Sequence, residues 1–301
     1  MLTYMKLAWR NMFRNKRRTF IAGTAIGIGL AAMILTDALM IGMKDNLIKS
    51  ATKSFLGEAQ IHQEEFRQTF EVEKTISNLD EVLNSLKNDS LVEHFTVRTL
   101  AIAMISSPAN VSAVSMVGIY PETEKYLSQI DEAIIEGEYF TGKSTHEIII
   151  GYKLAELLEV ELGDRVVLTT AQAKTGDLSQ EMFRISGIYR FNASDMDRGM
   201  AFIHLNRAQK MLNLEKRAHE IVIKFTDINL AQDENLYFWD KFSRENNEVV
   251  GWPIILPQLK MVFDLTDFSM AIMALILFGI VSLGIVNTLF MSLHERMFEF
   301  G

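Results

Sequence analysis

Residues 20–43 read FIAGTAIGIGLAAMILTDALMIGM, a run of 24 residues with a single charge, Asp37, near its far end. As an α-helix this run is about 36 Å long, enough to cross a hydrocarbon layer of about 30 Å with some tilt. It is also longer than the roughly 7–15 apolar residues of a cleaved signal peptide. The run therefore predicts a transmembrane helix, and we expect the Asp37 carboxylate, one turn from the outer end, to reach the membrane surface.

A second run of the same kind lies near the other end of the chain. Residues 268–293 read FSMAIMALILFGIVSLGIVNTLFMSL and carry no charge. Two buried helices of a soluble core are the alternative, but such helices rarely exceed about twenty residues without a polar stripe. Gly23 and Gly27 in the first run, and Gly279 and Gly284 in the second, favour close packing between helices.

Charge is distributed unevenly along the 301 residues. The formal net charge is −8, yet the first eighteen residues carry six Lys or Arg and no acid, so the remainder sums to −14. Because cations gather on the cytoplasmic side of membrane helices, the N-terminus is predicted to be cytoplasmic. Residues 44–266 are then extracytoplasmic, and residues 294–301 return to the cytoplasm after the second membrane segment, residues 267–293. A basic end on an acidic body indicates contact with a membrane surface and not with nucleic acid.

Residues 1–19 are predicted to form a cytoplasmic amphipathic helix. Met5, Trp9, Met12 and Phe13 share one helical face, with the cations largely on the other. This distribution is typical of a helix that lies on the inner leaflet. The membrane-surface residues assigned to it are Trp9, Arg10, Arg14, Arg17 and Arg18. A basic tail without helical structure is the alternative.

The extracytoplasmic region reads as a mixed α/β domain. Expected strands cover residues 57–63, 96–106, 111–120, 147–151, 165–171, 181–190, 201–205 and 220–225. Expected helices cover residues 43–55, 78–87, 153–160 and 231–246, and two more begin at Glu122 and Asn206. Residues from about 118 to about 217 differ in their pattern of strands and helices from the residues on either side. This difference predicts a subdomain inserted into a larger one.

Motifs for catalysis or cofactor binding are weak. The absence of cysteine excludes disulfides, thiolate metal sites and cysteine nucleophiles, and the six histidines show no metal-ligand spacing. One stretch, GEYFTGKS from Gly137 to Ser144, satisfies the phosphate-loop pattern. It leads into the β-branched run of residues 147–151 and not into the helix that phosphates require. We interpret it as a false match, and expect no catalytic residue, no cofactor and no metal in this chain.

Four segments, in this order, resemble a known family. They are LAWRNMFRNKRRT (residues 7–19), GIYPETE (residues 118–124), IIEGEYF with EIIIGYKLAELLEVELGDRVVL (residues 134–140 and 147–168), and HERMFEFG (residues 294–301). The set is similar to the permease subunits of ABC transporters of the FtsX/MacB-like superfamily, and among them to the lipoprotein-releasing, LolC/LolE-type permeases. The resemblance implies transmembrane helices, four in the intact family, and an outer α+β domain with a porter-like part and an inserted subdomain.

The resemblance also implies function, location and partners. It implies a non-catalytic permease of the bacterial inner membrane, a separate ATPase dimer that uses ATP and Mg, and a second permease copy or paralogue. A lipoprotein or another periplasmic substrate would be the cargo. The stretch after the second membrane helix resembles the cytoplasmic coupling helix that docks on the ATPase, which assigns Glu295, Arg296, Glu299 and Gly301 to that contact. An exposed helix end explains the same charges without docking.

Two departures from the family pattern affect these expectations. The chain stops at Gly301 inside the coupling motif, so we expect a C-terminally truncated or split chain. Residues 171–180, AQAKTGDLSQ, contain no proline, whereas LolC-type members carry a proline-rich hook for a periplasmic carrier; carrier binding therefore does not follow. Lipoprotein release is the first functional hypothesis, and MacB-like efflux or a peptide-antibiotic response is the second. An FtsX-like regulator of cell-wall hydrolases and a two-helix sensory receptor are the hypotheses from other classes.

Overall fold

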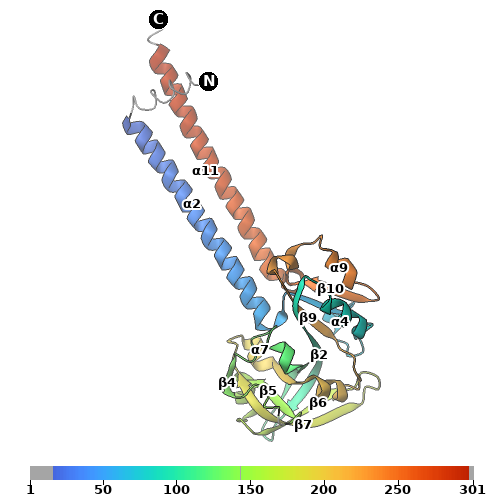
Figure 1. The fold of residues 1–301 in the computed structure, drawn as a ribbon. Coiled ribbons are helices and arrows are strands. Elements are labelled where there is room, and N and C mark those ends of the chain that lie inside the picture. The colour runs from blue at the N-terminus through green and yellow to red at the C-terminus, as the bar shows by residue number, and fades with distance from the viewer. Residues whose placement is uncertain (1–15, 143, 298–301) are drawn as a thin grey trace. The chain divides into compact units, whose positions relative to one another are not determined.

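The computed structural model describes residues 16–142 and 144–297 and divides the chain into two compact units. One unit contains residues up to 48 and from 258 onward, and the other spans residues 49–257. The first holds nearly all of two long helices, α2 (Lys16–Ala51) and α11 (Pro257–Met297) (Figure 1). Both are long and apolar enough to cross a membrane by length and composition. The two predicted membrane helices are thus present, and each continues beyond its apolar run.

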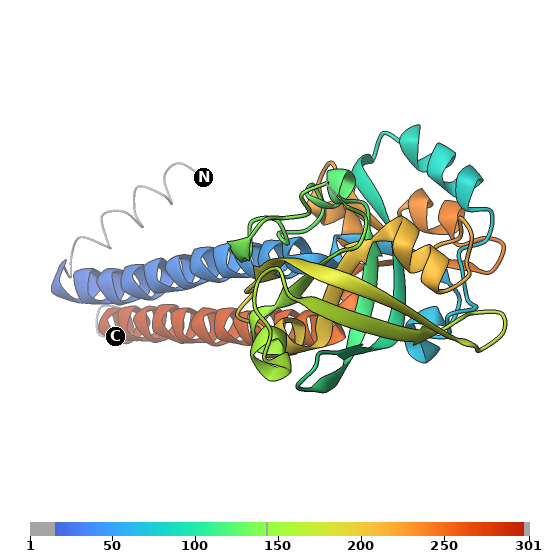
Figure 2. The same ribbon diagram turned by 90° about the horizontal axis from the view of Figure 1, so that it is seen from below.

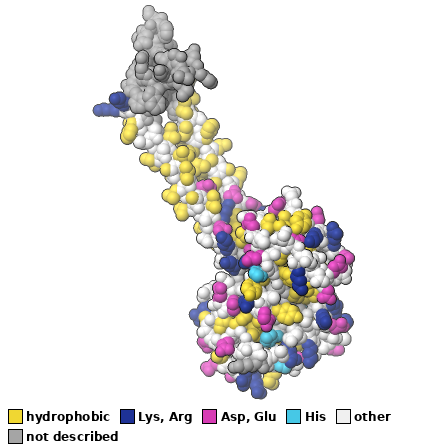
Figure 3. All heavy atoms as spheres, in the orientation of Figure 1, with side chains coloured by type: hydrophobic (Ala, Val, Ile, Leu, Met, Phe, Trp, Pro, Cys, Tyr) yellow, Lys and Arg dark blue, Asp and Glu magenta, His cyan; other side chains and the backbone are white. Residues whose placement is uncertain are grey.

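The two helices pack against each other within their unit. A Cβ atom on Gly29 of α2 would lie 3.0 Å from Cδ1 of Leu277 on α11. Near one end, Lys44 and Asp267 form an ion pair, and the Lys44 ammonium lies 5.6 Å from the ring centroid of Phe263. Hydrophobic side chains are frequent along the middle of the helical part in the face shown in Figure 3, as expected for helices that face lipid.

The unit of residues 49–257, called the outer unit below, begins and ends in one antiparallel sheet. Its strands are β1 (Ala59–Gln63), β9 (Glu220–Phe225), β10 (Asn247–Gly251) and the first half of β2 (Val92–Ser106). Strand β1 lies between β9 and β10, and Ala59 pairs with Gly251. The chain therefore enters and leaves this unit on neighbouring strands.

The other half of the outer unit is a closed six-stranded barrel, whose strands lie between β1 and β9 in the sequence. From β2 its pairing runs through β3 (Val111–Ile119), β8 (Met200–His204), β5 (Glu147–Gly151), β7 (Leu178–Tyr189) and β6 (Arg165–Ala171). Strand β6 then pairs back onto β2, with Met104 opposite Thr169. Strand β4 (Ile134–Gly137) adds to β7, outside the ring. Alternating apolar residues of the six strands fill the interior, for example Ile105, Ile150 and Ile203.

Short helices and turns complete the outer unit, which is seen from below in Figure 2. They are η1 (Thr52–Leu56), α3 (Phe66–Thr69), α4 (Leu79–Lys87), α5 (Pro121–Glu124), α6 (Tyr152–Leu158), α7 (Ser194–Gly199), α8 (Leu205–Met211), η2 (Ile228–Gln232), α9 (Tyr237–Phe242) and α10 (Trp252–Ile255). Helices α6 and α8 supply Leu154, Leu158 and Met211 to the barrel core.

Strand β2 joins the two sheets. Its residues up to Arg98 pair with β9, whereas residues from Thr99 onward pair with β3. The second sheet thus starts within β2, earlier in the chain than residue 118, where the sequence texture changes. Residues 96–101 of this continuous strand are all buried where it passes from one sheet to the other, and buried and exposed residues alternate only beyond Ala101.

The predicted helix over residues 231–246 is wrong. A 3₁₀ turn, a short helix and a strand, β10, occupy residues 228–251. An Asx turn interrupts the predicted helix, because the carboxylate of Asp233 accepts the backbone N–H of Asn235. A similar turn at Asp227 caps the 3₁₀ turn η2 before it. Glu245 and Asn246 then adopt positive φ angles of 56° and 66°, which direct the chain into β10. Strand β4 and helix α7 also went unpredicted.

Candidate functional site

The residues predicted to contact the membrane surface and the ATPase fall at the margins of the described chain. Trp9, Arg10, Arg14, Glu299 and Gly301 lie outside the described residues. Arg17 is exposed in the first turn of α2, where Arg18 follows it. Glu295 and Arg296 lie in the last turn of α11. All these roles remain predictions.

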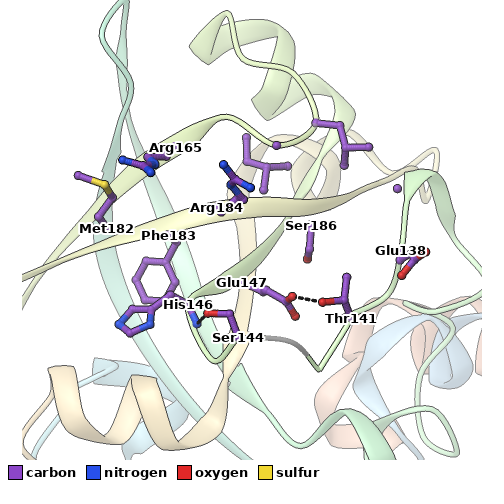
Figure 4. Close-up of a pocket in the computed structure, with 14 residues that line it drawn as sticks. Glu138, Thr141, Ser144, His146, Glu147, Arg165, Met182, Phe183, Arg184 and Ser186 are labelled. Carbon is purple, nitrogen blue, oxygen red and sulfur yellow. Dashed lines mark hydrogen bonds between the residues drawn. The ribbon is translucent and has the colours of Figure 1, made fainter.

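The false phosphate loop borders a cleft of about 640 Å³ in the barrel half (Figure 4). Gly137 ends β4 with φ of 79°, Gly142 has φ of 70°, and β5 begins at Glu147. Because the next described element is a strand, this loop lacks the helix N-terminus on which phosphates bind. Instead the Thr141 hydroxyl donates to the Glu147 carboxylate.

Two arginines lie side by side at the same cleft. Arg165 on β6 and Arg184 on β7 are direct cross-strand partners, both are exposed, and both line the cleft drawn in Figure 4. Like charges placed opposite each other repel, so an anionic group in the cleft would relieve this repulsion. Within the described parts of the chain, no three His, Asp or Glu side chains are placed to hold a metal ion.

A buried ion network lies where the barrel meets the first sheet. Arg98 of β2 is fully buried, and its guanidinium donates to both oxygens of Glu124 at 3.0 and 2.5 Å. A third bond of 3.0 Å reaches Glu220 at the start of β9. The other oxygen of Glu220 lies 3.2 Å from Nε2 of His62, and the Phe55 ring lies 3.8 Å from the guanidinium carbon.

Burial and charge act in opposite directions on this network. Burial alone would lower the pKa of the Arg98 guanidinium, but the charges of Glu124 and Glu220 outweigh burial and raise it. Burial alone would raise the pKa of Glu220, but the hydrogen bond from His62 and the charge of Arg98 outweigh it and lower that pKa. The Arg98–Glu220 pair is therefore held charged in the interior.

The segment GIYPETE supplies one side of this network. Gly118 leaves room for α8, because a Cβ atom there would lie 2.3 Å from the Cβ of Ala208. Pro121 starts α5, and the Thr123 hydroxyl lies 2.7 Å from that of Thr96 on β2. Glu124 ends the segment and accepts the two hydrogen bonds from Arg98. The sequence already marks this segment as a motif, and the structure gives a physical reason for each of these four residues.

Sequence reasoning missed Arg98 as a site residue. It is the only charge in the predicted strand TVRTLAIAMIS, residues 96–106, and a lone cation in an apolar run is a signal for a buried partner. Its partners lie 26 and 122 residues away in the sequence. These partners are brought to Arg98 by the pairing of the strands, which cannot be read from residues 96–106 alone.

Residues 19–234 match the family described as the MacB-like periplasmic core domain. The chain belongs to this family. The match covers most of α2 and most of the outer unit, so the resemblance to FtsX/MacB-like ABC transporter permeases is confirmed. Members of this family are transmembrane subunits with an outer α/β domain, and the predicted fold class is confirmed in these terms.

Two curated relatives of this MacB-like chain are lipoprotein-releasing system transmembrane proteins LolC. The protein from Neisseria meningitidis serogroup B is 20% identical over 302 residues, covering 98% of this chain and 70% of that protein. The protein from Xylella fastidiosa strain 9a5c is 22% identical over 244 residues, covering 77% of this chain and 54% of that protein. The chain thus spans 70% and about half of the lengths of these relatives.

Two solved structures are similar to the MacB-like domain at low sequence identity. The extracellular domain of the noncanonic ABC-type transporter YknZ from Gram-positive bacteria is 12% identical, covers 64% of this chain and 99% of that chain, and gives a TM-score of 0.45. The periplasmic region of MacB from Actinobacillus actinomycetemcomitans is 11% identical, with 69% and 94% covered and a TM-score of 0.45.

Proposed function

We propose that this chain is the permease subunit of an ABC transporter that releases lipoproteins from the bacterial inner membrane. The alignment with LolC carries the proposal, because it covers 98% of the chain and therefore both candidate membrane helices and the outer domain. The cation-rich N-terminus supports a cytoplasmic start and an outer domain on the periplasmic side.

In this proposal the chain performs no chemistry of its own. ATP and Mg bind to a separate ATPase dimer, and a second permease copy or paralogue completes the membrane part. Glu295, Arg296, Glu299 and Gly301 would form the start of the segment that docks on the ATPase. A short charged segment at the membrane exit can seat in a groove of a partner and receive its movement.

Docking is tested by charge reversal at Glu299. The Glu299→Lys variant of the native-length protein should lose association with the ATPase in a pull-down, because it places a cation where the partner groove accepts an anion. Glu156→Lys is the matched control, since Glu156 is an exposed acid of the outer unit and its reversal should leave association unchanged. Unchanged association of Glu299→Lys would remove this residue from the contact.

Cargo is tested in proteoliposomes that contain the permease, its ATPase and a triacylated lipoprotein. The proposal expects ATP-dependent release of the acylated protein and none of the same protein without its acyl chains. Export of a small molecule with no lipoprotein release would favour the efflux hypothesis instead. Dependence of a periplasmic amidase on the permease, without any export, would favour the hydrolase regulator.

A further inference from the structure

The turn that follows α2 places an aromatic ring on the buried ion network. Phe55 belongs to the π-helical turn η1 (Thr52–Leu56), which continues directly from the last residue of α2. Its ring is buried and lies 3.8 Å from the guanidinium carbon of Arg98. At this distance the ring face and the cation attract each other, and burial strengthens the attraction.

The turn is held firmly at its far end. Gly57 closes η1 with φ of 71°, and its N–H donates to the carbonyl of Thr52 at 2.8 Å. A Cβ atom on Gly57 would lie 2.1 Å from Cγ1 of Val222, so this position requires glycine. The next residue, Glu58, accepts the N–H of Phe225 on its carboxylate and the N–H of Trp252 on its carbonyl. The path from α2 into the first sheet is therefore short and fixed.

Arg98 connects this turn to both halves of the outer unit. It sits where β2 leaves β9 and begins to pair with β3. Its bond to Glu220 reaches the first sheet, and its paired bonds to Glu124 reach α5, which follows barrel strand β3. A displacement of the guanidinium therefore acts on both halves at once.

We propose that the stack of Phe55 on Arg98 is the joint through which movement of α2 is passed to both halves of the outer domain. Arg98 acts as a positioning residue, because it is fully buried and bonds elements of both halves. A planar guanidinium with a two-pronged carboxylate partner fixes direction as well as distance, which an apolar contact of the same volume does not. This inference rests on the proposed function, in which the ATPase drives the helices.

The test compares two matched leucine variants in the native-length permease with its ATPase. Phe55→Leu keeps an apolar side chain but removes the ring face from Arg98. Phe202→Leu makes the same change in the same cluster, with a ring centroid 5.6 Å from that of Phe55. We expect Phe55→Leu to keep ATP hydrolysis within about twofold and to lower lipoprotein released per ATP at least fivefold. Phe202→Leu should keep both.

Arg98→Lys supplies a second variant in case Phe55→Leu folds poorly. It keeps the charge but loses the planar fork, and should uncouple release from hydrolysis in the same way. Normal release by both Phe55→Leu and Arg98→Lys would overturn the proposal. Equal loss in Phe202→Leu would also overturn it, because general packing would then explain the effect.

A distance measurement separates this inference from the proposed function. Because the chain has no cysteine, Ser50→Cys at the end of α2 and Leu178→Cys on β7 accept two spin labels specifically. Pulsed EPR should give a narrow distance distribution in the parent protein and a broader one with Phe55→Leu. A narrow distribution in both would refute the joint even if lipoproteins are released. A broader distance distribution with Phe55→Leu, together with a parent protein that releases no lipoprotein, would refute only the proposed cargo.

Discussion

At the scale of single residues, Arg98 forms a buried ion network with the carboxylates of Glu124 and Glu220. Removing one member of a buried ion network leaves charge without compensation, which costs about 3–5 kcal/mol. Arg98→Ala should therefore lower the free energy of unfolding of the full chain by this amount, measured by thermal or denaturant unfolding in detergent. Arg165→Ala makes the same substitution at an exposed arginine and should change it by less than about 0.5 kcal/mol. Equal effects would mean that the network does not stabilise the fold.

His219 predicts how the outer domain responds to acid. Burial lowers the pKa of His219 from 6.5 to about 4, and its ring stacks on Phe66 at 4.9 Å. The unfolded chain therefore binds a proton at pH 6.5 that the folded chain accepts only near pH 4. The free energy of unfolding should fall by up to about 3 kcal/mol as pH is lowered through this range.

The control for this pH effect is His219→Gln. Glutamine can accept the N–H of Leu100 and donate to the carbonyl of Val72, as the imidazole does at 3.0 and 2.9 Å, but it does not titrate. Unfolding measured from pH 7 to pH 4 should show a shallower slope in this variant. An unchanged slope would assign the acid sensitivity to other groups.

At the scale of elements, the packing of α2 against α11 can be tested by cross-linking. Gly29→Cys with Leu277→Cys should form a disulfide on mild oxidation, because the contact at these positions is close and no native cysteine competes. Gly23→Cys with Leu277→Cys is the control, since nothing lies within 4 Å of a Cβ atom at Gly23. A disulfide in the control at the same rate would show that the helices slide.

The sequence predicted best those elements whose limits follow from the apolar pattern of their own residues. The runs at β5, β6 and β9 have the predicted limits, and the membrane helices follow from length and apolarity alone. The helix predicted over residues 231–246 was wrong because the bond from the Asn235 N–H to the Asp233 carboxylate competed with it. Such a bond leaves little trace in hydrophobic periodicity. The cross-strand pair of Arg165 with Arg184 was not predicted, since it depends on the register of two strands.

At the scale of the whole molecule, the order of parts was predictable, whereas the closure of the barrel was not. Two apolar runs around a mixed domain follow from the sequence, but the ring closes only when Thr169 of β6 pairs with Met104 of β2. The same separation in sequence hides the partners of Arg98. Long-range pairing is set by the complete set of strands, and no single stretch contains it.

The orientation of the chain gives a prediction for the whole molecule. Leu178→Cys on the outer unit should react with a membrane-impermeant maleimide in intact spheroplasts, because its parent side chain is 77% exposed. Arg17→Cys should react only after the membrane is opened, since the N-terminus is expected in the cytoplasm. The reverse pattern of labelling would invert the topology and, with it, the proposed place of the ATPase.

The pairing of Ala59 with Gly251 has an evolutionary consequence. Directly opposed residues of antiparallel strands lie only about 5 Å apart, so the two ends of the outer unit meet at one seam. A recombination event at that seam would exchange the whole unit as a cassette and leave the sequences of the two long helices unchanged.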